Sequence, residues 1–286
     1  MSGTLVLDAV TREYAANAGF WGRKTSFRAV DGVSLSVAPG ETLGIVGESG
    51  SGKSTLGRLA AGIEAVSSGK VLFDGQPYAP VGSRDWRRQR RLVQVIFQNP
   101  SGVIDPRLAI GRQIDEALAT HEALDRHARD RRVADMLDLV GLGSLGDRYP
   151  TQLSGGQLQR AVIARALIMR PEMVICDEAV SALDVSVQAQ IINLLMDLRE
   201  KLGLTMLFIS HDLGVIRHIS RKVAVMHRGK VVESGDVETL YSNPRHDYTR
   251  ALLAAIPVGS PAERRKRDTA QRTAAPVAQA SSLVQA

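Results

Sequence analysis

The chain has 286 residues, of which 44% are hydrophobic and 23% are charged, as in an ordinary globular protein of one or two domains. No apolar run approaches the ~18 residues of a membrane span, and residues 1–10 lack a basic region followed by an apolar stretch. We therefore expect no export signal and a cytoplasmic location. The single cysteine, Cys176, excludes an internal disulfide and an all-cysteine metal site, and its apolar neighbours predict a buried core residue.

The formal net charge of +6 permits nucleic acid, acidic lipid surfaces or nucleotides as partners, and it does not choose among them. Part of the excess lies in the basic run 264–267, where predicted order ends. A second basic cluster, residues 84–91 around Trp86, is interpreted as a solvated helical face, with a patch near lipid headgroups as the alternative.

Two strands are predicted near the start of the chain, at residues 5–10 and 30–37, because apolar residues partly alternate there. They suit an antiparallel edge sheet beside the segment 47–54 (GESGSGKS), whose spacing of Gly, Lys and Ser predicts a nucleotide site. Tyr14 ends the first strand region, and its ring is a candidate for stacking on adenine. The alternatives are a surface tyrosine or stacking by Phe20 or Trp21.

A phosphate-binding loop is predicted at residues 47–54 (GESGSGKS), which fit the pattern G-x-x-x-x-G-K-[ST]. A buried strand at 41–46 precedes it and a helix at 54–61 follows it, which is the context the motif requires. Closely spaced glycines let backbone N–H groups surround phosphate oxygens at the positive end of the helix. Lys53 would add charge at the β- and γ-phosphates, and the Ser54 hydroxyl would bind Mg²⁺.

A strand at 68–73, a turn at 74–75 and a buried strand at 92–97 come next. Gln98 follows the last of these strands, where its amide can reach a metal or water, although such a residue is more often part of a turn. Between residues 104 and 169 the pattern becomes helical, with helices predicted at 110–118, 131–140 and 157–169. This region is a helical insertion.

The last helix of the insertion begins after the sequence LSGGQ at 153–157. Ser154 is a predicted N-cap, and the two glycines leave backbone N–H groups open, which makes a second anion site or simply a capped helix start. Pro171 then breaks the helix. An apolar strand at 173–176 delivers Asp177 and Glu178 to its carboxyl end, where open α/β sheets bind ligands.

The remaining chain alternates between helix and strand. A tight loop at 181–184 precedes a helix at 187–202 that Gly203 ends, and a buried strand at 205–209 leads to His211. A lone histidine at a strand end is more often structural, but the same edge already carries Asp177 and Glu178. A hairpin at 222–234 turns about Arg228 and Gly229. Strand–helix alternation from the phosphate loop onward predicts a mostly parallel sheet and an α/β fold. A turn and a short helix are predicted at 243–257, and residues 262–286 are predicted to be largely disordered.

Together these features resemble the ATP-binding subunit of an ABC transporter over about residues 4–258. The resemblance rests on an ordered set: residues 47–54, Gln98, residues 153–157, Asp177 with Glu178, residues 181–184, and His211. The resemblance implies an α/β P-loop NTPase of ABC type, with a mostly parallel core sheet, an antiparallel edge sheet and a helical subdomain at about 103–169. It also implies an ATPase domain at 1–258, followed by a basic, disordered tail at 259–286.

Within this family, the chain is similar to the second ATPase of oligopeptide, dipeptide and nickel importers. The supporting stretches are residues 29–35, 44–59, 176–194 and 243–257. The sequence departs from that subfamily at Ala179 and Asp247, where proline is expected, at Leu158, where arginine is usual, and at 103–105. None of these departures removes a catalytic group, although Leu158 adjoins the LSGGQ segment.

The resemblance implies a composite ATP site with Mg²⁺ as cofactor. Glu178 would be the general base, His211 would hold the γ-phosphate, Gln98 would sense metal and water, and Asp177 would organise Mg²⁺ with Ser54 and Gln98. The residues implied to contact ATP are Tyr14, Gly47, Ser49, Gly50, Ser51, Gly52, Lys53, Ser54 and Thr55, with Ser154, Gly155, Gly156 and Gln157 contributed by a second subunit.

The implied partners are a second ABC ATPase, either a sister protein or a copy of this chain, and two transmembrane permease subunits at the cytoplasmic face of the membrane. An extracytoplasmic solute-binding protein would act indirectly, and no nucleic-acid partner is expected. Peptides are the favoured cargo, with nickel or another solute as alternatives. A non-transport ABC ATPase is disfavoured, because the chain has one motif set and a short helical insertion.

Overall fold

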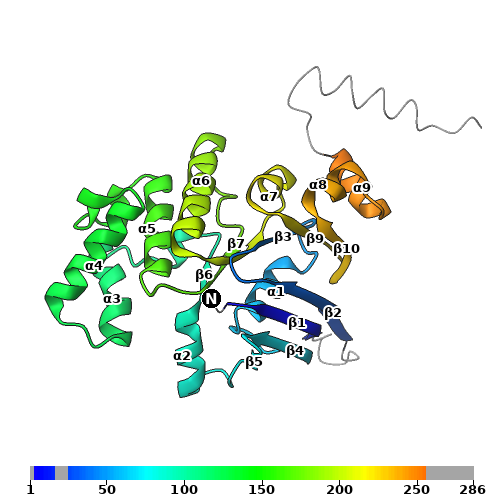
Figure 1. The fold of residues 1–286 in the computed structure, drawn as a ribbon, viewed down its shortest axis with the longest axis horizontal. Coiled ribbons are helices and arrows are strands. Elements are labelled where there is room, and N and C mark those ends of the chain that lie inside the picture. The colour runs from blue at the N-terminus through cyan, green and yellow to red at the C-terminus, as the bar shows by residue number, and fades with distance from the viewer. Residues whose placement is uncertain (1–2, 17–24, 256–286) are drawn as a thin grey trace, which may run out of the picture.

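The computed structural model describes residues 3–16 and 25–255, which form two β-sheets and the helices that cover them (Figure 1). The larger sheet has the order β10-β9-β3-β8-β7-β6, in which only β10 runs antiparallel to its neighbour. In that order, the strands are Lys230–Asp236, Lys222–His227, Thr42–Val46, Thr205–Ile209, Met173–Asp177 and Val93–Ile96. The mostly parallel core sheet is therefore confirmed.

The smaller sheet is antiparallel, as predicted, with the order β2-β1-β4-β5. Its strands in that order are Thr25–Val37, Leu5–Ala16, Ser68–Phe73 and Gln76–Pro77. The first two strands extend beyond the predicted 5–10 and 30–37. Register shifts interrupt the β1–β2 pairing after Leu7 and after Val10, so the apolar alternation is broken while the ladder of pairs continues to Ala16.

Helix α1 (Lys53–Ala60) lies between the two sheets. One core cluster joins Leu5 and Val30 of the antiparallel sheet, Leu56 of α1, and Ile45 and Ile175 of the parallel sheet. Because α1 begins where the phosphate loop ends, both sheets support the predicted nucleotide site through this core.

The parallel strands are apolar on both faces because both faces are covered. In β8, Leu207 and Ile209 pack into the core beside α1, whereas Met206 and Phe208 pack into a second core beneath the other helices. Cys176 of β7 belongs to this second core and is fully buried, as predicted. The sequences of such strands are continuous apolar runs, and these runs predicted the strands.

Helices α6 (Val185–Leu202) and α7 (Leu213–Ile219) contribute to the second core. Helix α6 starts after Asp184, whose carboxylate accepts the Ser186 and Val187 N–H groups, and it ends at Gly203 with φ of 66°. The predicted stop is confirmed. Helix α7 was not predicted, since it has only seven residues and its start is set by the Asp212 side chain.

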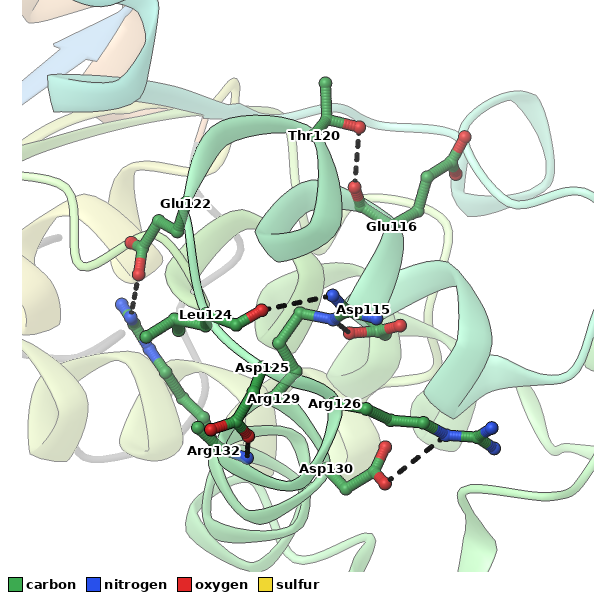
Figure 2. A network of polar contacts seen from close by, with 11 residues as sticks. Asp115, Glu116, Thr120, Glu122, Leu124, Asp125, Arg126, Arg129, Asp130 and Arg132 are labelled. Atoms are coloured by element: carbon green, nitrogen blue, oxygen red, sulfur yellow. Dashed lines mark hydrogen bonds and ion pairs between the residues drawn. The ribbon is translucent and has the colours of Figure 1, made fainter.

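The predicted helical insertion forms a lobe of α3 (Ile110–His121), α4 (Arg126–Leu139) and α5 (Gly155–Leu167) beside the parallel sheet (Figure 1). Figure 2 shows the polar contacts around the α3–α4 connection. Arg129 pairs with Asp115 at 2.8 Å, and Arg132 pairs with Glu122 at 2.5 Å while donating to the Ile168 carbonyl. These contacts tie α4 to α3, to the start of the connection and to the end of α5.

The basic cluster lies on α2 (Arg84–Leu92), a helix without a buried residue, which fits both a solvated helical face and a surface patch near lipid headgroups. The side of α2 that faces the protein nevertheless makes defined hydrogen bonds. Trp86 donates its indole N–H to the Gly62 carbonyl at 2.7 Å, and Arg90 donates to the Ala61 carbonyl at 2.7 Å. These bonds satisfy carbonyl groups at the carboxyl end of α1.

The predicted hairpin and C-terminal helix are present. Arg228 and Gly229 both have positive φ between β9 and β10, and α8 (Val237–Ser242) and α9 (Asp247–Ala254) follow. Short 3₁₀ helices occur at Pro100–Gly102, Gly143–Leu145 and Pro150–Gln152. Phe20, Trp21 and the predicted tail at 259–286 lie outside the described residues.

Replacing Phe208 by alanine is expected to lower the free energy of unfolding by about 3–5 kcal/mol, because a fully buried aromatic ring leaves a cavity between β8 and its covering helices. The matched control is Phe27→Ala, since the Phe27 side chain is 60% exposed and its loss should change stability by no more than ~0.5 kcal/mol. Urea denaturation of both variants measures the difference; equal losses would contradict the assigned core.

Candidate functional site

The phosphate loop is held by contacts between backbones. Strand β3 leads into Gly47, and Gly52 caps α1 with φ of 104°. A Cβ atom on Gly47 would lie 2.2 Å from the Met226 carbonyl oxygen, and one on Gly52 would lie 2.1 Å from the Ala29 carbonyl oxygen. Both positions therefore require glycine, and the loop is fixed against β9 and β2.

Lys53 is buried, with only 4% of its surface exposed. Its Nζ atom donates to the carbonyl oxygens of Gly47 and Glu48, both at 2.8 Å, so it spans the loop that carries it. Burial lowers its pKa, while the negative charges of Glu178 and Asp177 oppose that shift. The ammonium group thus lies among carbonyl oxygens and carboxylates, where phosphate oxygens are matching ligands.

Ser54 and Asp177 meet although 123 residues separate them. The Ser54 hydroxyl donates to Asp177 Oδ1 at 2.9 Å. Burial raises the pKa of Asp177, and the Ser54 hydrogen bond and the Glu178 charge act with smaller effect, in opposite directions. A hydroxyl and a carboxylate are hard oxygen donors that suit Mg²⁺, which typically takes few protein ligands beside phosphate and water. In residues 3–16 and 25–255, no three His, Cys, Asp or Glu side chains form a fuller metal site.

Glu178 has an unusual backbone, with φ of 50°, and its N–H donates to the Ile209 carbonyl at 3.0 Å. Positive φ is uncommon outside glycine and is concentrated at functional sites. His211, which follows β8, brings Nδ1 to 3.5 Å from Glu178 Oε2. The carboxylate is mostly covered, whereas the imidazole is 56% exposed, so this pair lies at the surface edge of the sheet.

Gln98 is connected to Glu178 through Ser181. Its side-chain amide donates to the Ser181 hydroxyl at 3.1 Å, and that hydroxyl donates to the Glu178 carbonyl at 3.0 Å. Because β3, β8, β7 and β6 are parallel neighbours, the phosphate loop, His211, Glu178 and Gln98 follow one another along one sheet edge.

The LSGGQ segment begins α5, next to Leu183 and the start of α6. Ser154 and Gln157 form a reciprocal cap: the Ser154 hydroxyl accepts the Gln157 N–H at 3.3 Å, and Gln157 Oε1 accepts the Ser154 N–H at 2.9 Å. The predicted N-cap is confirmed. Gly155 is exposed, and a Cβ on Gly156 would lie 2.6 Å from Val187 of α6. The adjoining Leu158 packs against the second core.

The other predicted loop residues differ in exposure. Ser49 and Gly50 are exposed, whereas Ser51 and Thr55 are buried, and Thr55 accepts a hydrogen bond from Arg58 at 3.3 Å. Tyr14 lies on β1, where its hydroxyl donates to Glu64 at 2.5 Å and its ring faces the Arg12 guanidinium at 4.8 Å. Its role as the adenine platform stays a prediction.

Sequence reasoning missed one residue at the phosphate loop. Tyr248 of α9 accepts the Glu48 N–H at 3.0 Å. The segment 243–257 supported the resemblance, but no local pattern indicates which side chain crosses 200 residues of sequence to reach the loop.

Comparisons with known proteins agree with this geometry. The family model "ABC transporter" matches residues 30–181, and the model "Oligopeptide/dipeptide transporter, C-terminal region" matches residues 232–282. A putative peptide import ATP-binding protein of Brucella abortus is 50% identical over 238 residues, which cover 82% of this chain and 71% of that protein. The oligopeptide transport ATP-binding protein OppF of Salmonella typhimurium is 48% identical over 251 residues, covering 87% and 75%.

Solved structures show the same fold. The dimeric ATP-binding cassette MJ0796, in a post-hydrolysis state bound to ADP and Pi, aligns with a TM-score of 0.71 and 27% identity over 82% of this chain and 98% of that one. CbiO1 from Clostridium perfringens, part of an ABC transporter complex, aligns with a TM-score of 0.73 and 27% identity over 85% and 92%. With a family model matching more than half of its length and relatives at about 50% identity, this chain belongs to the ABC transporter family as an ATP-hydrolysing ABC ATPase.

Proposed function

We propose that this chain is the ATPase subunit of a peptide importer and that it works at the cytoplasmic face of a membrane. The observation that carries the proposal is the pairing of an ATP-site edge, where Ser54 meets Asp177, with a C-terminal region of the oligopeptide/dipeptide transporter type. The relatives described as peptide import and oligopeptide transport ATP-binding proteins support the cargo class. In the described residues, none of the helices is long and apolar enough to cross a membrane.

The roles of the site residues follow from their contacts. Lys53 would exchange its two carbonyl partners for oxygens of the β- and γ-phosphates. Glu178 would accept the proton of the attacking water, and its backbone is fixed by the Ile209 carbonyl and by Ser181. His211, 3.5 Å from the Glu178 carboxylate, would orient that carboxylate and contact the γ-phosphate. Phosphoryl transfer depends mainly on such positioning and charge stabilisation.

Ser54 and Asp177 would hold Mg²⁺, with Gln98 on the same edge as a further oxygen donor. When bound, Mg²⁺ would add positive charge beside the β- and γ-phosphate oxygens. The chain's own contribution is to hold the Ser54 hydroxyl and the Asp177 carboxylate 2.9 Å apart before any nucleotide arrives.

A second ATPase subunit would complete each site. Ser154 and Gly155 are exposed, and the first N–H groups of an α-helix have no acceptor within the helix. We infer that Ser154, Gly155, Gly156 and Gln157 face a nucleotide held by another subunit. The dimeric form of the cassette MJ0796 supports this arrangement. Permease subunits would approach Gln98, which is exposed beside the helical lobe, and an extracytoplasmic binding protein would act through them.

Glu178→Gln is expected to lower ATP turnover by about 10²- to 10⁴-fold while leaving ATP binding intact, because the amide cannot accept the water proton but keeps the shape of the side chain. Turnover is measured as the rate of phosphate release, and ATP binding is measured by direct titration. The matched control is Glu200→Gln on the exposed side of α6, which should keep full turnover. If Glu178→Gln retained normal turnover, another residue would be the base.

Lys53→Ala is expected to weaken ATP binding by about 10- to 100-fold, since hydrogen bonds to charged groups contribute about 1.5–3 kcal/mol. Lys201→Ala removes an exposed lysine from the end of α6 and should leave the dissociation constant unchanged. Calorimetric titration of both variants measures the contrast. Equal affinities would show that Lys53 makes no contact with the bound phosphates.

The importer assignment is tested by purifying the tagged chain from gently solubilised native membranes and identifying its companions by mass spectrometry. We expect two multi-span proteins and a second ABC ATPase, or a second copy of this chain. Recovery of the chain alone in the soluble fraction, or with ribosomes or DNA, would overturn the importer proposal and leave the ATPase assignment standing.

A further inference from the structure

A C-terminal tyrosine contacts the phosphate loop from outside the ATPase family match. Helix α9 carries Tyr248, whose Oη atom accepts the backbone N–H of Glu48 at 3.0 Å. The match to the ABC transporter model ends at residue 181, whereas Tyr248 lies in the region matched by the oligopeptide/dipeptide transporter C-terminal model. The two matched regions therefore meet at the loop that binds phosphate.

The Gly47–Glu48 peptide unit, whose N–H bonds to Tyr248, also holds Lys53 through its carbonyl, as does the peptide unit that follows it. The Glu48 carbonyl accepts Lys53 Nζ at 2.8 Å and the Ser51 N–H at 3.2 Å, and the Gly47 carbonyl is the second acceptor of Lys53. The Glu48 N–H is bonded to Tyr248 and is therefore already satisfied within the chain. Rotation of the Gly47–Glu48 peptide would break this bond and move an acceptor of Lys53.

Tyr248 is itself fixed in place. Its ring packs against the His227 ring at the end of β9, with centroids 3.9 Å apart and planes tilted by 33°. Its N–H donates to His246 Nδ1 at 3.1 Å. On β10, the Glu233 carboxylate accepts the N–H groups of Arg245 at 2.8 Å and of His246 at 3.0 Å. The hydroxyl thus reaches the loop from a segment anchored to the β9–β10 hairpin.

The protonation of Tyr248 suits this role. Burial raises the pKa of its phenol, so the hydroxyl stays neutral at physiological pH and adds no negative charge to the loop. A neutral oxygen can accept the Glu48 N–H without competing with phosphate for Lys53.

We propose that Tyr248 is a positioning residue of the ATP site: by holding the Glu48 N–H, it keeps the phosphate loop and Lys53 in the arrangement that receives nucleotide. The C-terminal segment around α9 is thereby a working part of this site. The inference rests on the proposed role of the loop in ATP binding. Loss of the hydroxyl lets the loop populate other arrangements. The apparent affinity for nucleotide then falls in proportion to the fraction of molecules whose loop can still bind it.

Tyr248→Phe in the full-length chain is the direct test, because it removes the hydroxyl and keeps the ring against His227. We expect the dissociation constant of a fluorescent ATP analogue to rise about 2- to 10-fold, the range that one neutral hydrogen bond supplies. In the assembled complex, the KM for ATP should rise by the same factor while kcat changes less than about twofold. The matched control is Tyr241→Phe, whose hydroxyl donates to the Leu213 carbonyl, away from the loop.

Hydrogen exchange supplies a readout that needs no catalysis. In nucleotide-free protein, a peptide covering residues 43–56 should exchange faster in Tyr248→Phe than in the wild type or in Tyr241→Phe, because the Glu48 amide loses its acceptor. Unchanged exchange and unchanged analogue affinity in Tyr248→Phe would overturn the inference, as would equal losses of affinity in both tyrosine variants. Failure of the wild type to bind the analogue would instead count against the proposed ATP site.

Discussion

The close packing of backbone against backbone around the phosphate loop is the constraint on which the rest of the site depends. The loop touches the Met226 carbonyl of β9 at Gly47 and the Ala29 carbonyl of β2 at Gly52. Each of these strands belongs to a different sheet. The antiparallel sheet is therefore more than a cover for α1, because its edge backbone fixes the conformation in which α1 begins. A side chain at Gly47 would push the loop away from β9, and one at Gly52 would push the start of α1 away from β2.

Charge balance is the second constraint, and it links the loop to β7. Lys53 is almost completely buried, and an unpaired buried ammonium group would be costly. Its cost is offset by two loop carbonyls and by the nearby carboxylates of Asp177 and Glu178. The same carboxylates are in turn stabilised by Lys53 and, for Asp177, by the Ser54 hydroxyl. Positive and negative groups of the site thus hold one another in place before ATP binds.

The parts of the fold predicted correctly from sequence are those whose cause is local or periodic. Apolar runs predicted the buried strands because both faces of the parallel sheet are covered, and Ser154 and Gly203 predicted helix ends because caps act within one turn. The extension of β1 to Ala16 was missed, since its register shifts break the alternation. Helix α7 was missed because seven residues carry too little periodicity.

The candidate site was predictable to the extent that its residues sit in motifs. The loop at 47–54, Asp177 with Glu178, and His211 each follow a strand whose position the sequence reveals. Which atoms meet across long separations is a property of the packed fold. Neither the route from Gln98 through Ser181 to the Glu178 carbonyl nor the bond from Glu48 to Tyr248 has a local signature.

These two long-range routes enter the site from opposite ends of the parallel sheet. Gln98 follows β6, at one edge, and extends beside the helical lobe, whereas Tyr248 is anchored to the β9–β10 hairpin at the other edge. The route from Gln98 ends on the backbone of Glu178, the proposed base. The route from Tyr248 ends on the proposed phosphate-binding loop. Hydrolysis requires the base and the bound phosphates to be aligned with each other. A displacement at either edge of the sheet alters their relative position. The strand order therefore connects two separate surfaces of this chain to one site.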